Sequence, residues 1–193
     1  MQRIQLQKTH LLLDTNFLTH EEANYLLHFF LNQPIEFWNQ QTVKIFGKTY
    51  QSPRKERFIC QDTDKSYSYS NNSLKTHPWL NELNPVLDKL NKLGYNFNAV
   101  LINYYRDGKD SNGWHADNEK ELGEDPVIAS LSLGASRKFH LKSKTGAEKH
   151  VLTLNHSSLL IMGKGSQIHY KHQLPKMLKL AESRINLTFR QIF

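Results

Sequence analysis

The clearest structural signal in the chain is Arg184-Ile185-Asn186-Leu187-Thr188-Phe189-Arg190, close to its end. Polar and apolar residues alternate through this stretch without a break, which predicts a β-strand with two different faces. One face carries two arginines, an asparagine and a threonine. Taken alone, this polar face fits either a solvated edge strand or a fork of two arginines that binds a small dicarboxylate.

Short segments of the same kind occur from Phe97 onward. We expect strands at 98–105, 127–133, 137–141, 151–154, 159–162 and 184–193. Turn-forming pairs such as Asp107-Gly108 and Thr145-Gly146 separate them. This half of the chain therefore predicts an antiparallel sandwich or barrel.

The first half is mixed. Leu11 to Leu13 indicates a short strand, and Thr19 with Glu22 offers cap chemistry for a helix with an apolar stripe through Tyr25, Leu26, Phe29 and Phe30. A second helix is expected from Pro78 to Leu93, with leucines at 80, 83, 87 and 90. Residues 40–61 indicate basic strands and loops. The fold class is therefore α+β.

The composition narrows the function. The chain has 193 residues, which suits one hydrophobic core, and 25 Lys and Arg against 18 Asp and Glu give a net charge of +7. Such a charge favours a polyanionic partner. The single cysteine, Cys60, excludes an intrachain disulfide and a Cys-rich metal site. The chain has neither a membrane-spanning apolar run nor a signal-peptide pattern, so we expect a soluble intracellular protein.

One short motif suggests metal chemistry. His115 and Asp117 are two residues apart, so they would share a face of an extended segment. Two histidines and one carboxylate on one side of Fe(II) leave positions for oxygen and a cosubstrate. The candidates for the second histidine are His140, His150, His156, His169 and His172. His172 is favoured because it shortly precedes the arginine-bearing strand, although a His-x-Asp pair alone is more often a surface or capping feature.

These motifs together resemble the AlkB family of iron(II)- and 2-oxoglutarate-dependent dioxygenases, most closely its duplex-DNA-acting branch. The matching segments are 103–108, 113–119, 128–135, His172-x-Leu174-Pro175 and 184–190, in family order. The resemblance implies a double-stranded β-helix, or jelly-roll, core at 97–193. It also implies that residues 1–96 supply N-terminal helices and a nucleotide-recognition lid, the whole 1–193 forming one domain.

The resemblance also implies the ligands of the site. Fe(II) would be held by His115, Asp117 and His172. The 2-oxoglutarate site would be lined by Asn103, Tyr105, Arg184, Asn186, Thr188 and Arg190, with Arg184 at the distal carboxylate. O2 would be the second cosubstrate. No catalytic side chain is expected beyond the metal site.

Substrate contacts are expected mainly from the first half. Phe46, with Gly47 and Lys48, resembles the hairpin that inserts an aromatic ring into stacked bases, and a buried hairpin aromatic is its alternative. Arg54 is one of five cations from Lys44 to Arg57 that suit phosphates. Tyr67, Tyr69, Asn118 and Glu119 would face the flipped base.

Trp79 and Trp114 are expected to pack against other residues rather than to contact the substrate. Residues 137–149 either touch an opposite strand or form a solvated hairpin.

The resemblance implies an oxidative demethylase that repairs N-alkylated bases, such as 1-methyladenine and 3-methylcytosine, in DNA. The base would be flipped out and formaldehyde released. The alternatives are RNA as the substrate, the same chemistry on protein or lipid, and a nucleic-acid binder without catalysis. We expect alkylated single- or double-stranded DNA, or RNA, as the partner, no membrane, and a monomer. It would be cytoplasmic in a bacterium and nuclear in a eukaryote.

Overall fold

The computed structural model describes residues 1–45, 47–65, 67–69 and 72–193, with the backbone alone at 43–45, 67–69, 72 and 73. Its first half contains β1 (Gln2–Gln5), β2 (His10–Asp14), α1 (His20–Leu31), η1 (Ile35–Phe37), β3 (Thr42–Ile45), β4 (Lys48–Gln51), β5 (Lys55–Cys60), β6 (Tyr67–Tyr69), β7 (Asn72–Leu74), β8 (Thr76–Pro78), η2 (Asn81–Leu83) and α2 (Asn84–Lys92). Its second half contains β9 (Ala99–Tyr105), β10 (Asn112–His115), η3 (Lys120–Leu122), β11 (Ile128–Gly134), β12 (Arg137–Ser143), β13 (Lys149–Leu154), β14 (Leu159–Met162), α3 (Ser166–His169), β15 (Tyr170–Leu174) and β16 (Arg184–Arg190).

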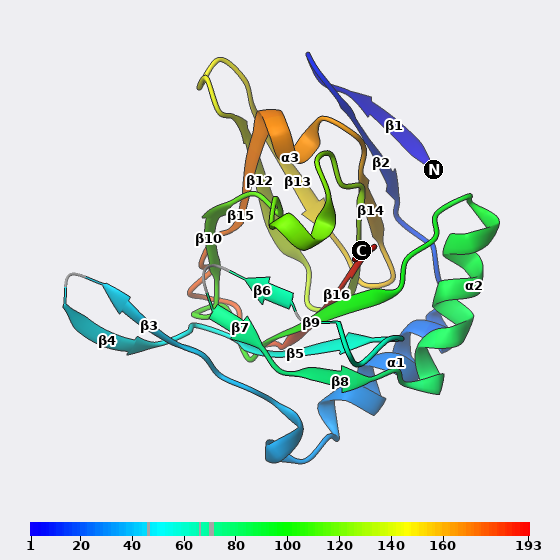
Figure 1. Ribbon diagram of the computed structural model, residues 1–193, viewed down its shortest axis with the longest axis vertical. Helices are drawn as coiled ribbons and strands as arrows, with labels where there is room; N and C mark the ends of the chain where they lie inside the picture. Colours follow the sequence, from blue (N-terminus) through cyan, green and yellow to red (C-terminus); the bar gives the residue numbers. More distant parts are fainter. Residues whose placement is uncertain (46, 66, 70–71) are drawn as a thin grey trace.

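Two sheets form the body of the molecule (Figure 1). The major sheet has the order β1-β2-β14-β11-β16-β9-β5-β8, and the minor sheet has the order β10-β15-β12-β13. All neighbouring pairs are antiparallel except β5 with β8. The expected α+β jelly-roll is therefore confirmed, and the first half of the chain contributes strands to the same major sheet.

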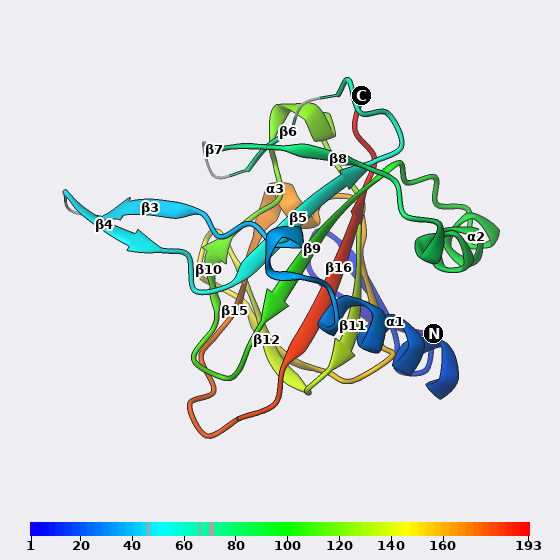
Figure 2. The same ribbon diagram turned by 90° about the horizontal axis from the view of Figure 1, so that it is seen from below.

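Alternation along the strands produces two apolar cores. On β16, Ile185, Leu187 and Phe189 point to the face that α1 and α2 cover. Figure 2 shows both helices on this side of the major sheet. The other face packs against the minor sheet through residues such as Leu101 and Leu141. The polar residues of β16 lie on this inner face, so the functional site is between the two sheets.

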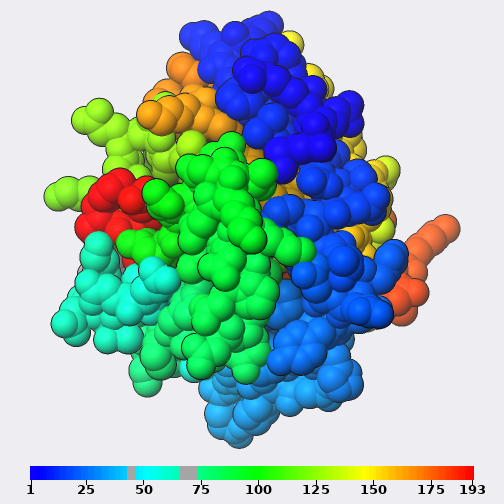
Figure 3. All heavy atoms as spheres, turned by 90° about the vertical axis from the view of Figure 1, so that its right-hand side faces the viewer, coloured from blue at the N-terminus to red at the C-terminus, as the bar shows by residue number. Residues whose placement is uncertain are grey.

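The N-terminal helix begins where its cap chemistry predicts. The Thr19 side chain accepts from the Glu22 N–H, and the Glu22 carboxylate accepts from the Thr19 N–H, which forms a capping box. Glu22 also pairs with Lys89 of α2 at 2.6 Å. Figure 3 shows the green surface around α2 beside the blue N-terminal segment that includes α1. The two helices therefore support the sheet together.

The second helix is shorter than the leucine pattern predicted. It begins at Asn84 with Pro85 in its first turn, which proline's fixed φ favours. Pro78 instead ends β8, whose Thr76 to Pro78 pair with β5 in parallel. The start at Pro78 was therefore wrong, because the sheet edge takes these residues. Strand β1 was also missed.

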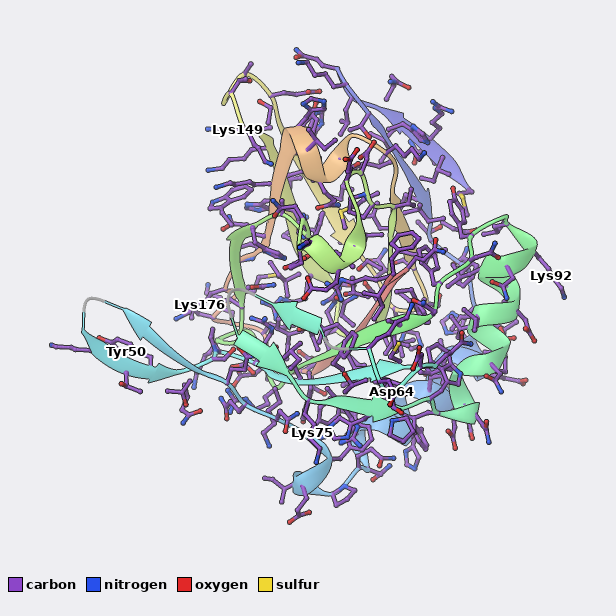
Figure 4. All side chains as sticks on the ribbon, in the orientation of Figure 1. Tyr50, Asp64, Lys75, Lys92, Lys149 and Lys176 are labelled. Atoms are coloured by element: carbon purple, nitrogen blue, oxygen red, sulfur yellow. The ribbon has the colours of Figure 1, made fainter. Side chains whose placement is uncertain are left out.

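The hairpin β3–β4 extends away from the body (Figure 1). Gly47 adopts a φ of 77°, a conformation that glycine favours in tight turns. Tyr50 is exposed on this hairpin (Figure 4). Phe46 and the side chains of Tyr67 and Tyr69 lie outside the described residues. Among the helices that the structure describes, none is long and apolar enough to span a membrane.

Candidate metal and cosubstrate site

The three expected metal ligands meet at the end of the minor sheet. His115 on β10 is the register partner of His172 on β15, and their ring centroids are 4.2 Å apart. Asp117 follows β10, and its Oδ1 lies 3.7 Å from His115 Nε2. One potential ligand atom from each residue lies within 4.8 Å of the others. Residues far apart in the chain thus form one side of a metal site.

Asp117 is prepared to bind a cation. Its backbone N–H donates to Gln167 Oε1 at 2.9 Å, and its Oδ2 accepts from Arg190 Nη2 at 3.1 Å. Burial opposes ionisation, but Arg190 and the two histidines outweigh it and lower the pKa of Asp117 to about 2. Oδ1 is buried, and no described residue forms a hydrogen bond with it. A buried carboxylate oxygen in this state suits a metal ligand.

The two histidines are suited to the neutral form that binds metals. Burial lowers the pKa of His172 to about 3, and burial also lowers the pKa of His115. His115 Nδ1 lies 2.7 Å from the Gly113 carbonyl oxygen, which can accept a hydrogen bond from a protonated Nδ1. This tautomer presents a lone pair at Nε2, where the Asn112 amide nitrogen approaches to 3.2 Å. Two imidazoles and one carboxylate fit the Fe(II) facial set.

At the end of β16 opposite Arg190, Arg184 has the chemistry of an anion site. Its side chain is 2% exposed, and Nη2 donates to Ser132 Oγ at 2.8 Å. Nε and Nη1 are buried and have no hydrogen-bond partner among the residues that the structure describes, and the guanidinium lies 5.4 Å from the centroid of the Tyr105 ring. Burial lowers the pKa of Arg184 to about 10, which leaves it charged at neutral pH. Two free donors on a planar cation suit a carboxylate.

Strand β16 is central, and all seven of its residues are buried between β11 and β9. The solvated edge strand is therefore the wrong alternative. Asn186 donates to Ser130 Oγ at 2.8 Å and to the Leu131 carbonyl at 3.0 Å, and its own oxygen accepts from Thr188. Asn186 thus holds the polar face of β16, which also carries Arg184 and Thr188, against β11.

The expected metal and cosubstrate residues line one pocket between the two sheets. These residues are Asn103, Tyr105, His115, Asp117, His172, Arg184, Asn186, Thr188 and Arg190. Apolar side chains complete the wall, among them Leu101, Phe139 and Met162. The candidate cation site and the candidate carboxylate site therefore share one pocket. The individual roles of these residues stay predictions.

Arg54 lies elsewhere than its expected role requires. It was expected to contact phosphate, but it is buried and donates to Asn103 Oδ1 at 2.8 Å and to Asn112 Oδ1 at 3.2 Å. It also pairs with Glu56 at 3.3 Å. The cause is the alternation of the chain around β5, which turns Arg54 and Glu56 toward the inner face. Arg54 therefore braces the site.

The remaining substrate residues are less enclosed. Asn118 is exposed and Glu119 is half-buried directly after Asp117, and Lys48 is exposed on the hairpin. Arg57 lies 4.1 Å above the Phe37 ring and donates to the Phe37 carbonyl. Of the five cations from Lys44 to Arg57, Arg54 and Arg57 are thus occupied by contacts within the protein.

Several functional residues were missed in the sequence. Ser130 and Ser132 alternate inward on β11, a period-two signal that could have been found. Gln167 on α3 fixes Asp117 from fifty positions away. Arg137 was read as part of a solvated or strand-contacting segment. It is 1% exposed and binds the carbonyls of Asp107, Asp110 and Pro175. Local patterns carry no signal for contacts of this range.

The other histidines do not join the centre. His156 accepts from the Gly134 N–H, which agrees with a turn histidine. His150 pairs with Glu148, and His140 lies beside Gln173. Within the described ranges, His115, Asp117 and His172 are the one group with metal-binding geometry.

Fold and site together define a class of protein. The family model of the 2OG-Fe(II) oxygenase superfamily matches residues 10–190, which is nearly the whole chain. A solved structure titled "The structure of OsALKBH1" has the same fold, with a TM-score of 0.68 at 18% identity over 97% of this chain and 100% of that one. The protein is thus placed in the class of Fe(II)- and 2-oxoglutarate-dependent oxygenases.

Curated relatives narrow the class. Bovine "DNA oxidative demethylase ALKBH2" is 40% identical over 78% of this chain and 57% of its own length. Human "Alpha-ketoglutarate-dependent dioxygenase alkB homolog 3" is 35% identical over 92% of this chain and 64% of its own length. Mouse ALKBH2 is 36% identical over 84% and 72%. The chain belongs to the AlkB family of 2OG-Fe(II) oxygenases. It spans about 60% of the length of the first two relatives.

Proposed function

We propose that this protein oxidatively removes alkyl groups from nucleic-acid bases. The observation that carries this proposal is one pocket that holds both the His115, Asp117, His172 set and the free donors of Arg184. Relatives named as a DNA oxidative demethylase and as an alkB homologue support the substrate class. When bound, Fe(II) and 2-oxoglutarate would supply O2-driven hydroxylation of a carbon–hydrogen bond, with succinate and carbon dioxide as by-products.

The residues of this chain would then act mainly by position. Arg184 would bind the distal carboxylate of 2-oxoglutarate, because Nε and Nη1 are open to an acceptor. Arg190 donates to Oδ2 of Asp117, so that Oδ1 would be the oxygen that binds the metal. Leu101, Phe139 and Met162 exclude water from the same pocket. Hydroxylation of an N-methyl group gives an unstable hemiaminal, which breaks its carbon–nitrogen bond to release formaldehyde and the repaired base.

The substrate must reach the pocket from outside. A methyl group on the pairing edge of a base is hidden in a duplex, so the base must be unpaired or flipped out. The projecting β3–β4 hairpin would carry Phe46 toward the stack, with Lys48 near phosphates. Tyr67 and Tyr69 of β6 would face the flipped base, with Asn118 and Glu119 at its edge.

We infer that DNA with 1-methyladenine or 3-methylcytosine is the preferred substrate. Both bases are cationic when methylated, and Glu119 would favour a positive base over a neutral one. The protein would act as a monomer. RNA is the second candidate, because the phosphates and base edges that these residues would contact are common to both nucleic acids.

The test is demethylation by the purified protein with Fe(II), ascorbate and 2-oxoglutarate. Matched oligonucleotides would carry 1-methyladenine in single-stranded DNA, duplex DNA and RNA, and mass spectrometry would follow loss of the methyl group. Turnover of the DNA strands above the RNA strand is expected, with Asp117→Ala inactive. No turnover on any strand, with continued uncoupled 2-oxoglutarate decay, would contradict the proposal and point to a protein or lipid substrate.

A further inference from the structure

The outer face of the minor sheet carries an unusual arrangement of charge. Lys142 on β12 is the register partner of Lys149 on β13 and of Lys171 on β15. Directly opposite residues point to the same side of a sheet, so these three side chains form one row across three strands. We call Lys149, Lys142 and Lys171 the lysine row. With strands about 4.8 Å apart, the row is about 10 Å long.

Like charges directly opposite one another destabilise a sheet, and none of the described outward residues of these strands is an acid that would offset them. The outward residues of the three strands are Lys138, His140, Lys142, Lys149, Val151, Thr153, Lys171 and Gln173. These include no acid, and no member of the lysine row forms an ion pair within the described residues. The neighbouring Glu148 is engaged with His150 and Tyr170. The row therefore suits an anionic partner.

An aromatic ring lies beside this row, on the strand that also carries His115. Trp114 directly precedes the metal ligand His115, and its side chain is 37% exposed. This exposure differs from the expected packing role. Lys142 Nζ lies 4.2 Å from the centroid of its ring, and the His140 ring lies 6.4 Å away. Exposed aromatic rings beside cations are typical of surfaces that bind unpaired bases.

We propose that the lysine row and Trp114 bind the single nucleic-acid strand that flanks the target base. This surface rests on the proposed function, because it assumes that the strand enters at His115. The lysines contact successive phosphates, and Trp114 stacks with a neighbouring unpaired base. The partner is single-stranded, because an exposed ring needs a base whose face is open. The sheet would hold the strand while the base occupies the pocket.

The test measures binding of an unmodified single-stranded oligonucleotide of about 12 nucleotides, a typical site size. Fluorescence anisotropy would give the Kd over a range of salt concentrations. For the double variant Lys142→Gln/Lys171→Gln, the slope of log K against log salt should fall by about 1.4, since each lost phosphate contact removes about 0.7. The Kd at low salt should rise roughly tenfold. An unchanged slope would overturn the proposal.

Lys92→Gln is the matched control. Lys92 is exposed on α2, and Figure 4 shows it on the side of the molecule away from Lys149. This variant removes one positive charge where the double variant removes two, and its slope should equal that of the unaltered protein. A fall of about 0.7 in the control, half of that in the double variant, would mean that the net charge alone governs binding, and the lysine row would be rejected. The double variant should melt no lower than the control, because it relieves repulsion within the row.

Trp114→Phe provides a separate signal. Stacking should quench tryptophan fluorescence on binding of the single strand, and most of this quenching should disappear in the variant. Stronger quenching by a duplex than by a single strand would contradict the assignment to an unpaired strand. Because the oligonucleotide is unmodified, these measurements do not depend on turnover. Loss of demethylation with the slope change intact would count against the proposed function alone.

Discussion

Arg184 and Arg190 stand on one strand, but their surroundings give them different tasks. Arg190 is committed to Asp117 at 3.1 Å. Arg184 donates to Ser132 Oγ, and within the described ranges its Nε and Nη1 have no hydrogen-bond partner. In place of a fork of two arginines, one alternative for this strand, the structure has one arginine with donors turned to the pocket and one that orients Asp117.

We expect Arg184→Met to weaken the binding of 2-oxoglutarate strongly. The variant removes a buried charge-assisted contact of about 2 to 3 kcal/mol, so the Kd should rise roughly a hundredfold. Titration of 2-oxoglutarate into the metal-loaded protein measures this directly. Arg3→Met, at an exposed position on β1, is the control with no expected change. An unaltered Kd for Arg184→Met would remove Arg184 from the cosubstrate site.

A second prediction at this scale concerns Arg137. Its guanidinium joins Asp107 and Asp110, before β10, to Pro175, directly after β15. Arg137→Met should lower the free energy of unfolding by about 3 kcal/mol, because buried carbonyls lose their donors. Urea denaturation would measure the loss, and Lys138→Met, one residue along the strand and exposed, should change little. Equal stabilities of the two variants would show that the contacts of Arg137 are dispensable.

At the scale of elements, the sequence predicted the helices, strands and turns that are determined by interactions between residues a few positions apart. The cap at Thr19, the strand at β16 and the turn residues all act within a few positions. The strands that hold the two histidines were not expected as such. β10 has only four residues and shifts register against β15, so no alternation marks it. Likewise, sheet pairing with β5 decides the place of β8 and the start of α2.

The capping box provides the prediction for an element. Thr19→Ala removes the side-chain acceptor of the Glu22 N–H and should destabilise the protein by about 1 kcal/mol. Thermal or urea unfolding would measure the loss. Thr63→Ala, in an exposed loop, should have little effect. If the two variants unfold alike, α1 does not depend on its cap.

At the scale of the whole molecule, the site depends on two sheets that close over one another. The inner faces bring β16, β11 and β9 opposite β15, and the polar row of β16 lines the pocket that His172 also lines. The residue types of the site could be predicted from the sequence. The distances could not, because they are set by long-range pairing such as that between His115 and His172.

Stability should also depend on pH through His156. Burial, and then the proximity of His20, lower the pKa of His156, which accepts a hydrogen bond from the Gly134 N–H. Below an ordinary histidine pKa of about 6.5, the unfolded chain binds a proton that the folded protein does not. The contribution of His156 to the free energy of unfolding is therefore complete above about pH 6.5 and falls as the pH drops. A single histidine limits this slope to at most about 1.4 kcal/mol per pH unit, and the partial exposure of His156 makes the total effect smaller.

His156→Gln tests this dependence, because glutamine can still accept from Gly134 but does not titrate. The free energy of unfolding of the unaltered protein should fall more steeply between pH 6.5 and about 5 than that of the variant. Parallel curves over this range would mean that His156 titrates equally in both states.

The central claim is that the His115, Asp117, His172 centre dealkylates a base in a reaction coupled to 2-oxoglutarate. The most direct measurement is the stoichiometry of succinate, formaldehyde and repaired base from single-stranded DNA with 1-methyladenine. We predict equal amounts of all three for the unaltered protein and none for Asp117→Ala. Succinate that forms without formaldehyde or repaired base, or repair that persists in Asp117→Ala, would contradict the account.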